Sequence, residues 1–540
     1  MALAASSAAN EFDAVIIGAG FSGMYQLLSL RDKLGLKARV LEAADGVGGT
    51  WYWNRYPGAR CDSESHSYSY YFSKELLQEW NWTERYPEQP EILRYLNHVA
   101  DRFNLRKDIQ LNTRVKSARY DQDSNRWTIT TEAGEIFRCT YFITAVGCLS
   151  SANVPKIAGL EDFKGDWYHT GQWPHEGVNF AGKRVGVVGT GSTGIQAIPV
   201  IAAQAKHVTV FQRTANYSIP ARNAPLSDEA KQYAKSHADE IHTIMTTNTN
   251  AHPFYIKDRS VFDVSDEERE QILEAAWQKG GLSFRAEFRD TLIDDKANQT
   301  VADFIRRKIR EIVKDTAKAE LLADIDHPFA AKRPPVDSHY FEAYNQPHVD
   351  LVNLRATPIE KITASGIKTA DQEYPLDIIV FATGFDAMTG SLLKIAIEGR
   401  DGLTLQEAWH AGPRNYLGLQ VPGFPNMFTV TGPGSPSVLC NMPPAIEHHV
   451  DWITRCISHM RQQGLQRIEA QEKEADDWVQ EVNEAANSTL LPSATHSWYL
   501  GANVPGKPRV FMPYAGGFAK YRQIVAERTG ANYRGFSFGN

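Results

Sequence analysis

Two glycine-rich segments have the residue types and spacing of phosphate-binding turns. Each follows a short apolar run, at residues 13–17 and 184–188, and each precedes an amphipathic stretch. In such a G-x-G-x-x-G turn the first glycine permits the bend and the second lets a pyrophosphate approach the backbone. The third lets the helix pack on the strand, and the phosphates lie at the positive end of that helix. The predicted binding residues are Gly18, Gly20 and Gly23 in the first turn and Gly189, Gly191, Ser192, Thr193 and Gly194 in the second.

The residue after each following strand indicates which nucleotide binds. Glu42 lies 22 positions after Gly20, where a carboxylate accepts hydrogen bonds from ribose hydroxyls but repels a 2′-phosphate. The first site therefore favours FAD or NAD. Arg213 lies 22 positions after Gly191, beside Thr214, and a guanidinium suits a 2′-phosphate. The most economical interpretation is FAD plus NADPH, with a flavin reduced by a nicotinamide.

The cysteines limit where the electrons can go next. The chain has five cysteines and no C-x-x-C, so it offers neither a redox dithiol nor a zinc ribbon, and no metal site is predicted. A disulfide-reductase reaction is excluded on this ground. The acceptor must be dioxygen, a quinone or a protein.

The elements around these residues predict an α/β protein. Each glycine turn belongs to a strand–turn–helix–strand unit, and residues 228–322 have helical apolar spacing with little strand signal. Strand composition returns at 376–383. The predicted fold is two Rossmann-like dinucleotide-binding domains, for FAD and NADP, both discontinuous, with a helical insertion.

Composition excludes several classes of function. The chain has 540 residues, 42% of them hydrophobic, and a net charge of −7. A mildly acidic chain lacks the positive field that nucleic acid or an anionic membrane requires. Residues 1–10 do not resemble a signal peptide, and no apolar run reaches the ~18–20 residues of a membrane span. We expect a cytoplasmic protein without nucleic-acid or membrane partners.

The segment between the two turns, FKGDWYHTGQWP at 163–174, carries a family resemblance. It is similar to the F-x-G-x-x-x-H-x-x-x-W-P fingerprint of Baeyer–Villiger monooxygenases, which are class B flavoprotein monooxygenases. The fingerprint residues are Phe163, Gly165, His169, Trp173 and Pro174. The resemblance extends over about residues 12–536 and is strongest to the phenylacetone monooxygenase branch. It includes a flavin loop at 48–62 that contains Gly49, Thr50 and Trp51.

The resemblance implies a reaction. It is the NADPH- and O2-dependent oxidation of ketones to esters or lactones through an FAD C4a-peroxide nucleophile, with sulfide oxidation as a side activity. Arg333 matches the family's catalytic arginine and Asp62 the carboxylate that pairs with it and orients it. An arginine stabilises an anion without giving up its proton. His169 matches a histidine that we expect to position the interdomain linker rather than transfer a proton.

Further residues receive roles from the same resemblance. Lys332 joins Arg213 and Thr214 around the 2′-phosphate, and Trp498 matches a tryptophan that closes over nicotinamide and substrate. The loop that shapes the ketone pocket corresponds to Ser437, Val438, Leu439, Cys440 and Met442. The implied FAD-binding domain comprises 1–145 and 386–540, the NADP-binding domain 146–222 and 327–385, and the helical insertion 223–326. A monomer is expected.

Two alternatives stay open at this point. An N- or S-oxygenating flavin monooxygenase has both nucleotide turns, although Arg333 and the Trp173–Pro174 pair argue against it. A non-catalytic NADP(H)-binding sensor could also keep both turns, but it would not need Asp62 or Arg333.

Overall fold

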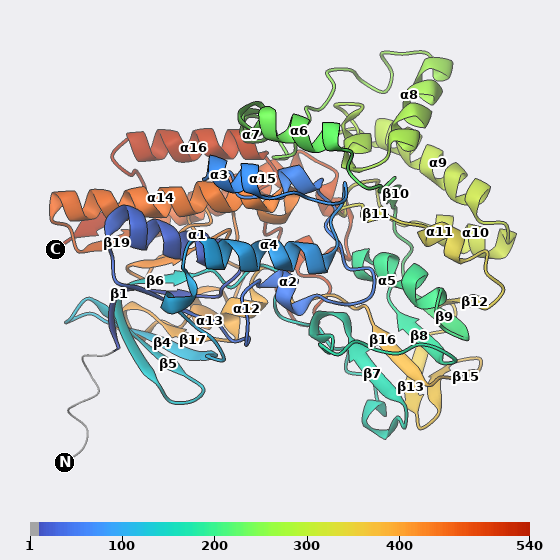
Figure 1. Cartoon of the computed structure of the whole chain (residues 1–540), viewed down its shortest axis with the longest axis horizontal. Coiled ribbons are helices and arrows are strands. Elements are labelled where there is room, and N and C mark those ends of the chain that lie inside the picture. Colours follow the sequence, from blue (N-terminus) through green and yellow to red (C-terminus); the bar gives the residue numbers. More distant parts are fainter. Residues whose placement is uncertain (1–9) are drawn as a thin grey trace.

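A computed structural model describes residues 10–540 and contains two large sheets with helices around them (Figure 1). The first sheet has eight strands in the order β17-β4-β5-β6-β1-β2-β3, with β18 paired to β6. Its strands are β1 (Glu11–Ile17), β2 (Ala38–Leu41), β3 (Ile109–Gln110), β4 (Val115–Asp121), β5 (Arg126–Thr131), β6 (Ile136–Thr144), β17 (Ala396–Glu398) and β18 (Met427–Thr429). Both ends of the chain therefore build one sheet.

The second sheet has five parallel strands in the order β12-β9-β8-β16-β7. They are β7 (Asp166–His169), β8 (Arg184–Val188), β9 (His207–Gln212), β12 (Val349–Asn353) and β16 (Ile378–Phe381). Parallel strands with both faces covered are apolar throughout, and the four residues 185–188 of β8 are all buried. The expected α/β fold with two nucleotide-binding sheets is confirmed.

Short helices and turns connect the sheet strands. They include α1 (Phe21–Leu28), α2 (Thr50–Trp53), α3 (Lys74–Glu79), α4 (Gln89–Arg102), α5 (Ser192–Ala202), α11 (Tyr340–Ala343), α12 (Gly390–Leu393) and α13 (Leu405–Ala408). Three smaller sheets are formed by β10 (Ile219–Pro220) with β11 (Val336–Asp337), by β13 (Ile359–Thr363), β14 (Gly366–Thr369) and β15 (Glu373–Pro375), and by β19 (Arg467–Ala470) with β20 (Phe536–Gly539).

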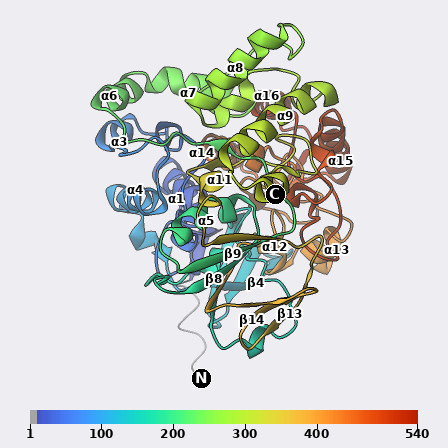
Figure 2. The same cartoon turned by 90° about the vertical axis from the view of Figure 1, so that its right-hand side faces the viewer.

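The range predicted for the helical insertion, 223–326, contains five α-helices, which lie above the second sheet in Figure 2. Its helices are α6 (Asp228–Ser236), α7 (Ala238–Thr247), α8 (Asp266–Lys279), α9 (Asp295–Ile312) and α10 (Thr316–Ala323). Four of them begin at a serine or aspartate whose side chain accepts an N–H of the first turn. Such caps satisfy backbone donors that the helix leaves unpaired.

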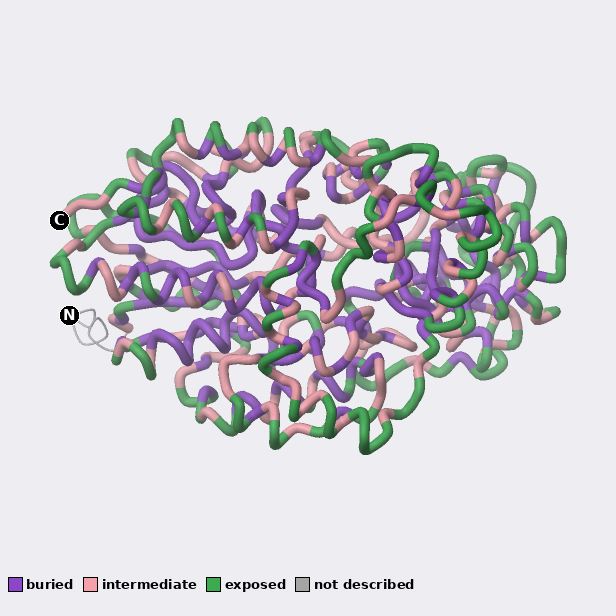
Figure 3. The backbone as a smooth tube through the Cα atoms, turned by 90° about the horizontal axis from the view of Figure 1, so that it is seen from above, coloured by how far each residue is buried: buried purple, intermediate pink, exposed green. Residues whose placement is uncertain are grey.

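The C-terminal helices return to the first sheet. They are α14 (Met442–Gln463), α15 (Glu472–Asn487) and α16 (Phe518–Gly530), and α14 lies beside α1 from the start of the chain (Figure 1). Helices α1 and α14 share one buried apolar core, and Figure 3 shows buried segments inside both halves of the molecule. Among residues 10–540, no helix has the length and hydropathy of a membrane span.

Element boundaries differ slightly from the sequence prediction. The first helix ends at Leu28 and continues as one π-helical turn to Lys33, and α5 begins at Ser192, directly after its turn. Strand β2 ends at Leu41, so Glu42 lies just beyond it.

Candidate functional site

The first glycine turn is closed to side chains on several sides. Gly18 has a φ of +101°, and a Cβ there would lie 2.6 Å from the carbonyl oxygen of Ala145. A Cβ on Gly23 would lie 1.8 Å from the carbonyl oxygen of Gly18. A Cβ on Gly20 would lie 3.3 Å from the Cα of Gly49, in the loop before α2. The turn and the loop thus approach backbone to backbone, which is the approach a dinucleotide requires.

Glu42 holds this turn in place. Its carboxylate accepts the backbone N–H of Ala19 at 2.6 Å and that of Ala44 at 2.8 Å. Burial raises the pKa of the carboxyl group, while these two hydrogen bonds lower it. A carboxylate has about four acceptor positions, so two positions stay available for ribose hydroxyls.

The flavin loop continues into α2. Thr50 is the first residue of that helix, and the buried indole of Trp51 donates to the hydroxyl of Tyr68 at 3.2 Å. The loop then reaches the second nucleotide domain, because the hydroxyl of Tyr56 donates to the side chain of Gln196 in α5 at 2.8 Å. The flavin loop therefore contacts the helix that begins at the second glycine turn.

The second glycine turn is open where a phosphate would approach. Gly189 has a φ of +113°, and a Cβ there would lie 2.5 Å from the carbonyl oxygen of Ala382. A Cβ on Gly194 would lie 2.2 Å from the carbonyl oxygen of Gly189. A Cβ on Gly191, in contrast, would meet no atom within 4 Å. This space, at the exposed N-terminus of α5 beside Ser192 and Thr193, fits a pyrophosphate.

Positive charges gather beside this turn, as predicted from the resemblance. Arg213 is exposed at the end of β9 and next to Thr214. Burial lowers the pKa of Lys332, the charge of Asp326 raises it, and the charges of Arg213 and Arg355 lower it again. Three cations therefore lie near one another, and Arg355 is paired with Asp326. Sequence reasoning missed Arg355. Arg355 follows β12, and β12 pairs in parallel with β9, which precedes Arg213. A prediction of this strand pairing could have identified Arg355.

Arg333 and Asp62 meet between the two domains. The Nε of Arg333 lies 3.8 Å from Oδ2 of Asp62, and Nη1 donates to the carbonyl of Val438 at 3.2 Å. Burial raises the pKa of the Asp62 carboxyl and the charge of Arg333 lowers it. The backbone N–H of Val336 also donates to Asp62, at 3.4 Å. The predicted pair therefore forms across 271 positions of chain and orients the guanidinium.

Two basic side chains near Arg333 were not predicted. Burial and the charge of Arg333 lower the pKa of Arg285, in the insertion, to about 10. Burial and, after it, the charge of Arg333 also hold the pKa of the buried His252 imidazole well below its usual value. His252 is therefore a neutral imidazole, and the surroundings of Arg333 carry excess positive charge.

The predicted ketone loop adjoins Arg333. Ser437, Val438 and Cys440 are buried, whereas Leu439 and Met442 are partly exposed. Burial raises the pKa of the Cys440 thiol to about 12, so this side chain is an apolar wall and not a nucleophile. The partly buried Trp498 packs against the apolar cluster that contains Val438.

The fingerprint residues lie at the edge of the second sheet. His169 ends β7 and is buried, with its Nδ1 accepting the N–H of Gly171 at 3.0 Å. Burial lowers the pKa of this imidazole. Trp173 is buried, Phe163 packs in the core beneath this sheet, and a Cβ on Gly165 would lie 2.3 Å from the carbonyl oxygen of Asp377. With Pro174 directly after Trp173, these contacts support a positioning role for the fingerprint.

Comparisons with known proteins cover nearly the whole chain. The family model of flavin-binding monooxygenase-like proteins matches residues 13–223. A Baeyer–Villiger monooxygenase of Pseudooceanicola batsensis is 44% identical, with 96% of this chain and 94% of the relative covered. The phenazine N-monooxygenase of Lysobacter antibioticus is also 44% identical, with coverages of 98% and 97%. The crystal structure of OTEMO in complex with FAD and NADP is 41% identical and has a TM-score of 0.94, with coverages of 98% and 99%.

Proposed function

Since this chain belongs to the Baeyer–Villiger monooxygenases, we propose how its own residues carry out that family's reaction. The protein is an FAD-dependent enzyme that uses NADPH and dioxygen to convert ketones to esters or lactones. The observation that carries the assignment of residues is the partly buried Arg333–Asp62 pair beside the 437–442 loop.

Arg333 is the residue that we propose for stabilising negative oxygen. Its Nη1 donates to the carbonyl of Val438, and its Nε forms the ion pair with Asp62. Its Nη2 has no hydrogen-bond partner within residues 10–540. Nη2 is therefore free to donate to a substrate oxygen. Because a guanidinium does not lose its proton at working pH, it stabilises an anion without protonating it. Asp62 positions this group.

The two turns and the cation cluster hold the nucleotides. We assign FAD to the first turn, with Glu42 toward the ribose and residues 49–51 beside it, and NADPH to the second. Arg213, Thr214 and Lys332 then receive the 2′-phosphate. When bound, the reduced flavin supplies the activated dioxygen for the reaction.

The remaining residues orient the ketone and exclude water. Val438, Leu439, Cys440 and Met442 offer an apolar wall that favours an uncharged ketone. We propose that Trp498, packed on the same cluster, covers this wall. Exclusion of water strengthens the interaction of Arg333 with a developing charge.

The test is mass spectrometry of products formed with NADPH, ¹⁸O₂ and a panel of aryl, linear, cyclic and steroid ketones. The wild-type enzyme is expected to release an ester or lactone with one labelled oxygen. Arg333→Ala should lose ester formation and retain NADPH-driven flavin bleaching, whereas Arg307→Ala, a surface arginine of α9, should retain both. Ester formation by Arg333→Ala at a near wild-type rate would remove this residue from the mechanism.

N-oxygenation is the second reaction to test, because a phenazine N-monooxygenase is as similar in sequence as the ketone-oxidising relative. A phenazine added to the same panel measures it. A labelled N-oxide without any ester would favour this reaction, and a labelled ester without N-oxide would exclude it. Sulfide oxidation is measured in parallel as the proposed side activity.

Several expectations stay predictions. The sheets and helices support the proposed domain boundaries, with first-sheet strands from 11–144 and 396–429 and second-sheet strands from 166–212 and 349–381. The monomeric state is proposed from the family resemblance, and the cytoplasmic location and the lack of nucleic-acid or membrane partners are proposed from composition and charge.

A further inference from the structure

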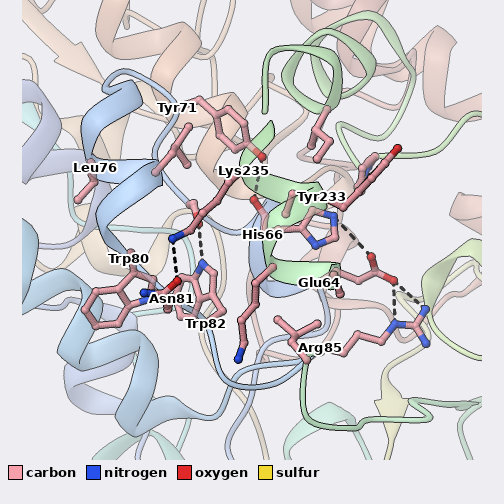
Figure 4. A pocket seen from close by; sticks show the side chains of 18 of the residues that line it. Glu64, His66, Tyr71, Leu76, Trp80, Asn81, Trp82, Arg85, Tyr233 and Lys235 are labelled. Carbon is pink, nitrogen blue, oxygen red and sulfur yellow. Dashed lines mark hydrogen bonds and ion pairs between the residues drawn. The ribbon is translucent and has the colours of Figure 1, made fainter. Parts of the chain in front are cut away.

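A cavity of about 430 Å³ lies between the FAD-binding part and the helical insertion (Figure 4). One wall comes from residues 64–95, including α3, and the other from residues 226–253, including α6 and α7. Cavities of ~300–1,000 Å³ are the usual size of small-molecule sites. Arg333 and the residues of the two glycine turns do not line it.

The interior of the cavity is apolar and aromatic. Leu76, Trp82, Tyr95 and Ile241 are each at most 7% exposed, and Trp80 adds a second indole. The indole N–H of Trp82 already donates to Ser69 at 3.0 Å. Such a surface binds rings and alkyl groups through burial and offers them few polar contacts.

The half-buried charged groups of the wall are already paired, and Glu240, which also lines the cavity, is exposed to solvent. Arg85 donates to Glu64 at 2.7 Å. Lys235 donates to the side chain of Asn81 at 2.7 Å, as the dashed lines in Figure 4 show, and Lys231 lies 3.2 Å from Asp228 on its own helix. An ionic ligand would have to displace these partners, so the cavity favours an uncharged ligand.

His66 is one polar group that remains available, beside the buried indole N–H of Trp80, which has no partner within residues 10–540. The Nε2 of His66 lies 3.7 Å from Glu64, beyond hydrogen-bond distance, and no hydrogen bond from its ring forms within residues 10–540. Burial lowers the pKa of this imidazole, which is therefore neutral. A neutral imidazole offers one donor and one acceptor.

The same stretch of chain faces the active site on its other side. Glu64, His66, Ser69 and Tyr71 line the cavity. Between His66 and Ser69 in the sequence, the backbone carbonyl of Ser67 accepts a hydrogen bond at 2.7 Å from the side chain of Asn441, inside the 437–442 loop. The hydroxyl of Tyr68 accepts one from the indole of Trp51 in the flavin loop.

From these contacts we propose that this cavity is a second, non-catalytic binding site for uncharged, ring-containing apolar molecules, with His66 as the hydrogen-bond partner of those that carry a carbonyl. This chemistry is shared by a ketone substrate and by other apolar compounds without a carbonyl. A molecule bound there packs the insertion against the segment 64–71 and acts on the ketone loop through Ser67.

The experiment uses oxidised holoenzyme with NADP⁺, so that no turnover occurs. Binding of 4-fluoroacetophenone, 4-fluorotoluene and 4-fluorobenzoate is followed by ¹⁹F NMR titration. We expect two sites for the ketone, a cavity site for 4-fluorotoluene, and no cavity site for the anionic benzoate.

Two cavity-filling variants locate the second site. Ala234→Trp in α6 and Ile244→Phe in α7 both place extra volume in the cavity, and Ile244→Phe serves if the larger change prevents folding. Each should remove one ketone site and keep the other. Gln232→Trp is the matched control, because Gln232 is an exposed α6 residue outside the cavity wall and should keep both sites.

Three results would overturn the proposal. They are the lack of a cavity site for both the ketone and 4-fluorotoluene, a full set of wild-type sites that persists in a folded cavity-filling variant, and benzoate binding in the cavity as tight as that of the uncharged ligands. Binding of 4-fluorotoluene alone would assign the cavity to apolar compounds other than the substrate and would still support an uncharged-ligand site. Since none of these measurements needs turnover, they are independent of the proposed ketone oxidation.

Discussion

Replacing Gly191 with alanine separates nucleotide binding from folding at the second turn. A methyl group at Gly191 would meet no atom within 4 Å, and the backbone φ of −81° suits any residue. A methyl group at Gly194 would lie 2.2 Å from the carbonyl oxygen of Gly189. Gly191→Ala should therefore fold normally, and Gly194→Ala should not.

The magnitude follows from the space that the methyl group fills. The methyl group lies where a pyrophosphate approaches the N-terminus of α5, and it would displace the phosphate from backbone N–H donors. A hydrogen bond to a charged group contributes about 1.5–3 kcal/mol, so the loss of one raises the KM for NADPH roughly 10- to 150-fold. Stability should be unchanged or higher by about 0.4–1 kcal/mol, because alanine restricts the unfolded chain more than glycine does.

The assay combines steady-state KM for NADPH with thermal unfolding of the holoenzyme. Gly194→Ala is the steric control and should lose about 1–3 kcal/mol of stability or more, since its neighbour is backbone. A wild-type KM in Gly191→Ala would refute pyrophosphate binding at this turn. A lower melting temperature in that variant would refute the inference that the space is open.

Three more perturbations test other parts of the site. Arg213→Ala and Lys332→Ala should each raise the KM for NADPH about tenfold and leave the KM for NADH nearly unchanged, because each removes one positive side chain that faces the 2′-phosphate. Equal effects on both nucleotides would contradict this role. Gly49→Ala should weaken FAD retention, measured by flavin release on dilution, because Gly49 has a φ of +54° and its Cβ would lie 2.8 Å from the Cα of Gly20; full retention would contradict the close approach. Burial raises the pKa of Glu447 to about 8, so the folded state binds the proton of this carboxyl more tightly than the unfolded chain does. The free energy of unfolding therefore falls as pH rises from about 4.5 to 8. That fall is at most about 5 kcal/mol, and Glu447→Gln should flatten it in denaturant titrations at pH 5 and pH 8; parallel profiles of variant and wild type would exclude this carboxyl as the cause.

The local parts of the fold were predictable from sequence because their signals are local. An apolar run, three glycines at fixed spacing and a helix are contiguous, so both turns could be located to the residue. Glu42 could likewise be placed, because its distance from Gly20 is set by one helix and one strand. Helix ends were less predictable, as the π-helical turn at 29–33 illustrates, because packing rather than propensity decides them.

The meeting of distant residues could not be derived from spacing. Asp62 and Arg333 were paired through the family resemblance, since nothing in their neighbourhoods predicts a contact across half of the chain. Arg285 and His252 were missed for the same reason, because each belongs to the insertion, whose placement depends on tertiary packing. Arg355 was missed because its importance depends on β12 lying next to β9.

The pairing of β18 with β6 has a consequence for synthesis on the ribosome. Residues 142–144 of β6 bond to Met427–Thr429, which are made roughly 280 residues later. At about 5–20 residues per second, that edge waits on the order of 15–60 s for its partner. During this time its unpaired N–H and C=O groups can join other chains, as at any open sheet edge. Nascent or truncated chains that end before residue 427 are therefore the forms of this protein with the greatest need for chaperones.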